Sequence, residues 1–176
     1  MRYHPIDPTL FVHNREKLAQ HLKPNSLVIL NANDILPENG DGVMPFRQNS
    51  DLFYLSGIDQ EETLLVLYPD APQKEWQEML FLKPTNEHIK IWEGQKYSQE
   101  EAQRVAGIAN IHWLEAFPSL LHTLMRYATH IYLNTNEHTR AVVEVPTREA
   151  RFIAWCQEKY PMHQYERLAP LMHHLR

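Results

Sequence analysis

The run Leu27-Val28-Ile29-Leu30 constrains the fold of this chain more than any other stretch. In an extended strand, consecutive side chains point to opposite faces, so an uninterrupted apolar run needs cover on both faces. Such a strand belongs in the interior of a sheet that carries helices on each side. The run therefore predicts an α/β domain with a buried strand at residues 26–31.

Three further segments have the composition of strands, at residues 52–56, 63–68 and 78–83. The connections between them are short and show no helical pattern. Parallel neighbours need a crossover connection of about a dozen residues or more. We therefore expect these three segments to form an antiparallel meander.

Helical patterns surround these strands. Ser98-Gln99-Glu100-Glu101 is a capping box that starts a helix, and Gly107 is suited to end it. Further helices are expected at residues 8–22, 117–128, 146–160 and 168–176, and further strands at 111–114 and 131–133. The chain is therefore predicted to be an α/β domain with a mixed β-sheet of about six strands and helices on both faces.

Composition narrows the class of protein. Among the 176 residues, Lys and Arg number 17 against 22 Asp and Glu, so no basic excess exists to bind a nucleic-acid backbone. The N-terminus lacks an apolar signal core, and no apolar run is long enough to span a bilayer. The single cysteine, Cys156, fits a reduced compartment and is expected to be a buried structural thiol. We predict a cytoplasmic protein without a membrane or nucleic-acid partner.

Motifs for metal binding or covalent catalysis are missing from the sequence. The 11 histidines show no H-E-x-x-H spacing, and the adjacent His173 and His174 face different sides of a helix. There is no G-x-S-x-G elbow, and 5 glycines are too few for a phosphate-binding loop. We predict no catalytic residue and no metal ligand within this chain.

Two residues are candidates for ligand contact. Asp41 lies in a long loop between Gly40 and Gly42, where it is suited either to an Asx turn, the simpler role, or to a ligand. Trp92 precedes the turn residue Gly94 and is suited either to packing in the core or to forming an aromatic wall for a ligand. The residues alone leave both alternatives open.

The stretch from Arg47 to Ile58 runs from a polar cluster into an aromatic segment and stops at Gly57. Arg47 and Asp51 are close enough in sequence to form an ion pair that fixes the entry loop. Phe53 and Tyr54 are expected on opposite faces of the predicted strand. An architectural role accounts for this pattern without any chemistry.

This stretch resembles the N-terminal-domain signature of aminopeptidase P, the Xaa-Pro aminopeptidases of the creatinase/prolidase group. Gly40-Asp41 upstream, Ile91-Trp92-Glu93-Gly94 downstream and residues 168–176 at the end also match in order, so the resemblance covers essentially the whole chain. Gln95 departs from the family pattern, in which Arg or Pro is more usual. The positions that carry the structural signature are Arg47, Asn49, Ser50, Asp51, Tyr54 and Gly57.

The resemblance implies a two-domain enzyme that removes the N-terminal residue preceding proline from peptides. Residues 1–176 would be its N-terminal domain, of the creatinase/prolidase type with a ribonuclease H-like motif. A C-terminal "pita-bread" domain, absent from this chain, would hold two divalent metal ions, typically manganese, through two Asp, one His and two Glu. Because the chain ends where the family enters that domain, we expect an inactive fragment of a longer polypeptide that binds no metal.

The resemblance also implies partners. These are the catalytic domain of the same polypeptide, neighbouring subunits of a homo-dimer or tetramer, and the peptide substrate. An aspartate and a tryptophan of the family's N-terminal domain approach the active site of a neighbouring subunit, and by motif position they correspond to Asp41 and Trp92. Two alternatives stay open, namely a free-standing binding or assembly module and the N-terminal domain of a prolidase- or creatinase-type relative.

Overall fold

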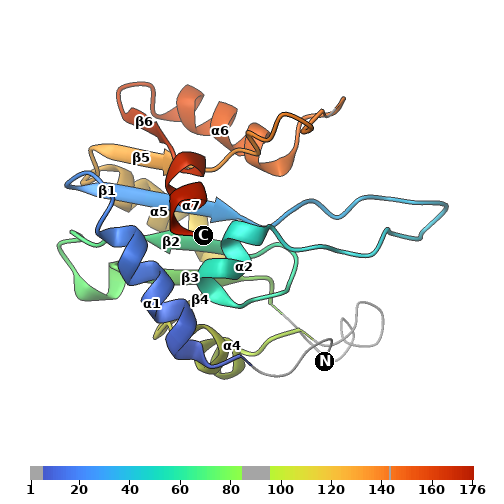
Figure 1. The fold of residues 1–176 in the computed structure, drawn as a ribbon, viewed down its shortest axis with the longest axis horizontal. Helices are drawn as coiled ribbons and strands as arrows, with labels where there is room; N and C mark the ends of the chain where they lie inside the picture. Colours follow the sequence, from blue (N-terminus) through green and yellow to red (C-terminus); the bar gives the residue numbers. More distant parts are fainter. Residues whose placement is uncertain (1–5, 85–95, 143) are drawn as a thin grey trace.

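A six-stranded mixed sheet runs through the middle of the computed structural model, which describes residues 6–84, 96–142 and 144–176 (Figure 1). The spatial order of its strands is β4-β3-β2-β1-β5-β6. The strands are β1 (Ser26–Asn31), β2 (Leu64–Leu67), β3 (Glu78–Leu82), β4 (Asn110–Trp113), β5 (His130–Leu133) and β6 (Gln164–Arg167).

Strand β1 lies in the interior of the sheet and has a neighbour on each side. It pairs antiparallel with β2 and parallel with β5, so that Val28 lies opposite Leu67 on one side and Tyr132 on the other. The pairs β2–β3 are antiparallel, whereas β3–β4 and β5–β6 are parallel. All six residues of β1 are buried, which confirms the strand predicted from its apolar run.

Helices cover both faces of the sheet, as the sequence predicts. Helices α1 (Pro8–Ala19), α2 (Ser50–Ser56), α4 (Gln99–Ala106) and α7 (Ala169–Leu175) lie on the side that faces the viewer in Figure 1, and α5 (Phe117–Met125) and α6 (Arg148–Lys159) cover the other. Short 3₁₀ turns are also present at η1 (Lys74–Trp76) and η2 (Leu114–Ala116). Among the described residues, no helix combines the length and apolarity needed to cross a membrane.

Two hydrophobic cores result from the alternation of side chains along the strands. Val28 and Leu30 of β1 pack with Leu52 and Met172 in the core beneath α1, α2, α4 and α7. Leu27 and Ile29 face the other way, into the core beneath α5 and α6. The two cores together account for the cover on both faces that an uninterrupted apolar strand requires.

The segment at residues 52–56 is a helix, so the predicted strand there is wrong. Its side chains Leu52, Leu55 and Ser56 are buried at helical spacing, and its ends carry helix-specific caps. Asn49 caps the first turn and Gly57 ends the helix in the left-handed conformation. A short apolar run fits a strand or a buried helix equally well, and here the two caps decide. The antiparallel unit is consequently β1-β2-β3, with β1 in place of the expected segment.

Strand β6 was not predicted. Its sequence Gln164-Tyr165-Glu166-Arg167 is polar, which suits its position at the edge of the sheet, where β5 is its only partner among the described residues. Edge strands of natural proteins often carry charged side chains, which prevent pairing with other molecules. A search for apolar runs therefore does not predict an edge strand whose side chains are mostly polar.

Helix α1 holds the ends of two other helices. The buried guanidinium of Arg15 donates to the carbonyl oxygens of Leu55 (2.8 Å) and Ala106 (2.9 Å), the last turns of α2 and α4. It also forms an ion pair with Glu78 of β3 at 3.0 Å. The final carbonyls of a helix lack partners within the helix, so Arg15 satisfies groups that burial would otherwise leave unpaired.

We predict that Gly57→Ala lowers the free energy of unfolding by about 2–4 kcal/mol, because two penalties combine. Gly57 has φ +69°, which strains a residue with a side chain, and an added Cβ would lie 2.3 Å from the ring of Phe11. Gly40→Ala is the matched control, since Gly40 has φ +57° but nothing within 4 Å of that position. Urea titration should show the larger loss at Gly57, and equal losses would contradict the steric argument.

Candidate functional site

The signature residues build and anchor helix α2. The side-chain oxygen of Asn49 accepts from the backbone N–H groups of Asp51 (2.9 Å) and Leu52 (3.2 Å), while Ser50 is the exposed first residue of the helix. An asparagine at this position satisfies donors that the first helical turn leaves free. Asn49, Ser50 and Gly57 thus define where the helix begins and ends.

Asp51 and Tyr54 connect α2 to the C-terminal helix. The carboxylate of Asp51 accepts from the Asn134 amide at 2.7 Å and forms an ion pair with Arg176. The Tyr54 hydroxyl donates to the Leu175 carbonyl at 3.2 Å, and the Arg176 guanidinium lies over the Tyr54 ring. The signature therefore fixes the position of α7.

The predicted ion pair between Arg47 and Asp51 is wrong. Both residues are described, and the cationic partner of Asp51 is Arg176, which lies far away in sequence. The side chain of Arg47 is exposed, and its backbone carbonyl accepts from the Asn33 amide at 3.0 Å. Sequence proximity suggested the wrong partner because the fold brings the end of the chain onto α2.

Residues 32–47 form an arm that extends away from the body of the structure at the carboxyl end of β1 (Figure 1). Its two limbs pair through an isolated bridge between Pro37 and Val43 and through a bond from the Met44 N–H to the Leu36 carbonyl at 2.9 Å. Asp41 lies at the tip of this arm. The arm is therefore a hairpin that presents Asp41 to its surroundings.

The tip turn does not use the Asp41 side chain. The turn is closed by the backbone hydrogen bond from the Gly42 N–H to the Asn39 carbonyl at 2.9 Å. The exposed Asp41 carboxylate makes no hydrogen bond or ion pair with any residue that the structure describes, so the Asx turn predicted as its simpler role is not formed. Trp92, the other candidate, lies outside the described residues.

A cavity of about 640 Å³ lies between the base of the arm, the loop after β5 and the start of α6. It adjoins the carboxyl ends of the parallel neighbours β1 and β5. In open α/β sheets, ligands bind in crevices of this kind, outside the carboxyl ends of strands. We call it the sheet-end cleft; its walls include Asn33, Leu36, Phe46, Asn134, Val145 and Arg148.

Hydrogen bonds from the start of helix α6 to a carboxylate of the arm connect the two elements across this cleft. The Asp34 carboxylate accepts from the backbone N–H of Arg148 at 2.7 Å and from the guanidinium of Arg151 at 2.6 Å. The carboxylate thus lies at the N-terminus of α6, where unpaired N–H groups and the helix dipole favour negative charge. Asp34 fills the anion-binding position of this helix from within the chain.

Glu149 is buried at the inner edge of the cleft. Its carboxylate accepts from the backbone N–H of Asn31 at 2.9 Å and from the Asn31 amide at 3.1 Å, linking α6 to β1. Burial raises the pKa of Glu149 to about 7, although the bonds from Asn31 act in the opposite direction.

Burial, with a smaller contribution from Glu149, also raises the pKa of the Cys156 thiol to about 12. The predicted burial of Cys156 is confirmed.

We predict that Glu149→Gln removes a pH dependence of stability. In the unfolded chain this carboxyl ionises near its ordinary pKa of 4.5, whereas in the folded chain it does so near 7, so wild-type stability falls as the pH rises through this window. The glutamine variant should be more stable than wild type at pH 8 by about 3 kcal/mol, with little difference at pH 4. Urea unfolding at both pH values measures this.

The matched control is Glu158→Gln, which neutralises an exposed carboxylate on the same helix. It should keep the wild-type difference in stability between the two pH values. If Glu149→Gln also keeps that difference, the buried carboxyl is not its origin.

The part of the chain that the structure describes contains no group of three or more His, Cys, Asp or Glu side chains arranged to hold a metal ion. Its polar residues at the sheet end instead contact one another. Sequence analysis missed Asp34, Asn134 and Glu149. Asn134 directly follows β5, so a search for polar residues at the ends of apolar strands would have found it.

Fold and site together define a mixed-sheet α/β domain whose polar residues hold helix ends and loops at one end of the sheet. The chain belongs to the family described as "Aminopeptidase P, N-terminal domain", which matches residues 11–132. A Xaa-Pro aminopeptidase from Haemophilus influenzae is 26% identical over 130 residues, which cover 73% of this chain and 30% of that protein.

Other relatives agree with this assignment. Intermediate cleaving peptidase 55 from Saccharomyces cerevisiae is 34% identical over 87 residues, covering 48% of this chain and 17% of that protein. A solved structure assigned to aminopeptidase P from Bacillus anthracis shares the fold with a TM-score of 0.87 at 24% identity, covering 97% of this chain and 40% of that one. The chain therefore spans about 30% of the length of the Xaa-Pro aminopeptidases that it matches.

Proposed function

We propose that this chain is the N-terminal, non-catalytic domain of a cytoplasmic Xaa-Pro aminopeptidase, which removes the residue that precedes proline at the N-terminus of peptides. The observation that carries the proposal is the family match over residues 11–132, in a chain that spans about 30% of the length of its Xaa-Pro aminopeptidase relatives. The domain would serve assembly and closure of an active site that lies on the catalytic domain.

The metal ions of such an enzyme would be held by the catalytic domain. The described residues of this chain offer no ligand set for two divalent ions, manganese or other, so we assign none of them to a metal. The contribution of this chain to the reaction would be the placement of side chains near a substrate that another domain binds.

The arm is the element best suited to reach a neighbouring subunit. It extends away from the sheet and carries an exposed carboxylate, Asp41, at its tip (Figure 1). A carboxylate is suited to accept hydrogen bonds from the charged α-amino group of a peptide. We therefore propose that Asp41 contacts the amino terminus of the substrate, and that Trp92 forms an aromatic wall beside the proline.

Exposed apolar side chains support contact between this end of the sheet and another protein surface. Four of them lie on the arm and two on the loop that follows β5. They are Ile35, Leu36, Val43, Met44, Val142 and Val145. Apolar groups gathered at one end of a domain commonly mark an interface, which here would be formed with the catalytic domain or with a neighbouring subunit.

We predict that purified chain 1–176 does not cleave a Xaa-Pro peptide in the presence of Mn²⁺, because the groups that would activate water belong to the catalytic domain. Release of the N-terminal amino acid, followed by mass spectrometry, measures this. The polypeptide that includes the catalytic domain is the positive control. Cleavage by the chain alone, at a rate that scales with its concentration after repeated purification, would overturn the proposal.

In the enzyme that includes the catalytic domain, we predict that Asp41→Asn raises KM for a Xaa-Pro peptide roughly tenfold or more and changes kcat less. The reason is that a hydrogen bond between two charged groups contributes about 1.5–3 kcal/mol. Glu38→Gln, at another exposed acid on the same arm, is the control and should leave KM near the wild-type value. If the two variants have the same KM, Asp41 does not contact the substrate.

A further inference from the structure

The arm at residues 32–47 has little apolar packing to set its direction. Four of its apolar side chains are between 41% and 58% exposed, namely Ile35, Leu36, Val43 and Met44. Backbone hydrogen bonds within the arm, such as the one from the Glu38 N–H to the Gly42 carbonyl at 2.9 Å, shape the hairpin but do not attach it to the sheet. A two-stranded hairpin is marginally stable on its own. The direction of the arm therefore depends on polar contacts at its base.

The outgoing limb of the arm is held by Asp34. One carboxylate oxygen accepts from the backbone N–H of Arg148 at 2.7 Å, and the other accepts from the guanidinium of Arg151 at 2.6 Å. Hydrogen bonds to an ionised acceptor are stronger than those between neutral groups. The two oxygens thus join the arm to the first turn of α6 in one defined orientation.

That turn of α6 is itself fixed to the sheet. The buried Glu149, which follows Arg148, accepts from the backbone N–H and the side-chain amide of Asn31, the last residue of β1. Neighbouring residues at the start of α6 therefore contact the end of β1 and the arm that leaves it. Because every residue of β1 is buried, α6 gives Asp34 a firm support.

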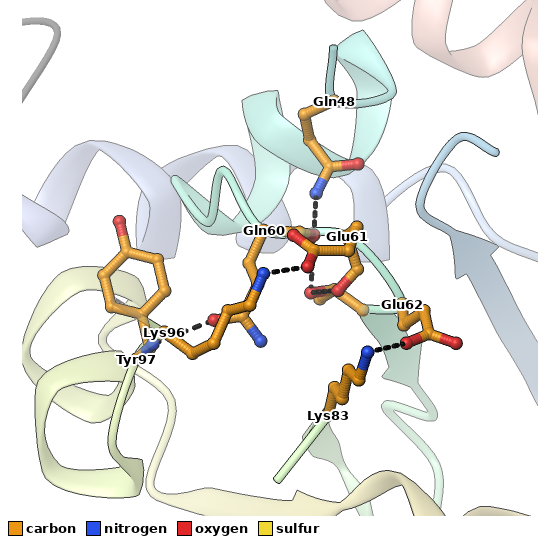
Figure 2. A network of polar contacts seen from close by, with 8 residues as sticks. Gln48, Gln60, Glu61, Glu62, Lys83, Lys96 and Tyr97 are labelled. Atoms are coloured by element: carbon orange, nitrogen blue, oxygen red, sulfur yellow. Dashed lines mark hydrogen bonds and ion pairs between the residues drawn. The ribbon is translucent and has the colours of Figure 1, made fainter. Parts of the chain in front are cut away.

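The returning limb is held by Gln48, which directly follows the arm. Its side-chain amide donates to the carbonyl oxygens of Ile58 at 3.1 Å and Gln60 at 2.8 Å, and Figure 2 shows it reaching the turn between α2 and β2. The Asn33 amide donates to the Arg47 carbonyl at 3.0 Å and joins the two limbs at their base. Among the described residues, the hydrogen bonds between the arm and α6 all involve Asp34.

We propose that Asp34 is a positioning residue, which sets the direction in which the arm presents Asp41 by binding Arg151 and the start of α6. The inference rests on the proposed function for the use made of Asp41 at the amino terminus of the substrate. Asp34 itself does not touch the substrate. A small rotation at the base of a hairpin becomes a larger displacement at its tip, and a misplacement of about 1 Å can slow a reaction about 100-fold.

Pulsed electron paramagnetic resonance on chain 1–176 measures the direction of the arm without any peptidase assay. Spin labels at Glu38→Cys on the arm and Glu158→Cys on α6 report the distance between the two elements, and both positions are exposed. The native Cys156 is buried, so its thiol stays unlabelled in the folded chain.

We expect Asp34→Ala to raise the fraction of molecules outside the main distance peak about tenfold, because the loss of hydrogen bonds to a charged acceptor changes an equilibrium constant by that order. Arg151→Met should give a smaller rise, since the Arg148 N–H keeps its acceptor. Because the Arg151 side chain is exposed, this second variant is expected to fold even if Asp34→Ala does not. If the distance distribution of either folded variant matches the wild type, the proposal is overturned.

Asp70→Ala is the matched control for this measurement. The Asp70 carboxylate also accepts from a backbone N–H, that of Asn25 at 2.7 Å, but at the opposite end of β1. This variant should keep the wild-type distance distribution even if its melting temperature falls. A change as large as that of Asp34→Ala would mean that lost stability alone loosens the arm, and would overturn the positioning role.

A second measurement uses the enzyme that includes the catalytic domain. Asp34→Ala should raise KM for a Xaa-Pro peptide in the wild-type background but have no added effect in an Asp41→Asn background. Independent effects of the two substitutions would overturn the link to Asp41. An Asp41→Asn enzyme with the wild-type KM would instead contradict the proposed function, while the distance measurement still decides whether Asp34 directs the arm.

Discussion

The arrangement of helices on one face of the sheet depends on a single buried cation. Arg15 of α1 binds the last carbonyl groups of α2 and α4 and reaches Glu78 on β3, so one side chain joins three helices to the sheet. A buried charge is tolerated only when its donors are matched by acceptors, and here backbone carbonyls that need partners supply them. Removing one member of a buried charged pair typically lowers the free energy of unfolding by about 3–5 kcal/mol.

Glycine makes this arrangement possible. Both α2 and α4 end at a glycine with positive φ, and both glycines lie against α1: a Cβ on Gly57 would meet Phe11 at 2.3 Å, and one on Gly107 would meet Val12 at 2.8 Å. The close approach allows the Arg15 guanidinium to reach the helix ends. The most recognisable stretch of the sequence, which ends at Gly57, is therefore an architectural element: it caps a helix, holds α7 through Asp51 and supports the turn at Gln60.

Sequence reasoning succeeded where local chemistry decides the structure. The buried strand β1 follows from its apolar run, and helix α4 follows from the capping box at Ser98 and the stop at Gly107, because these signals act over a few residues. It failed for residues 52–56, since an apolar run of that length fits two structures. It also missed β6, whose polar residues become a strand only because β5 offers them an edge.

The sequence by itself determined the α/β class, the burial of β1, the caps of helix α4 and the family resemblance carried by residues 47–58, because each depends on near neighbours along the chain. Only the tertiary structure decided which distant groups meet. It paired Asp51 with Arg176 rather than with Arg47 and buried Glu149 against Asn31. It also placed Asp41 at the tip of an arm, where its side chain has no hydrogen bond or ion pair with the described residues. The physical reason is that hydrogen bonds, ion pairs and pKa values depend on distance and burial in three dimensions, which sequence spacing does not specify.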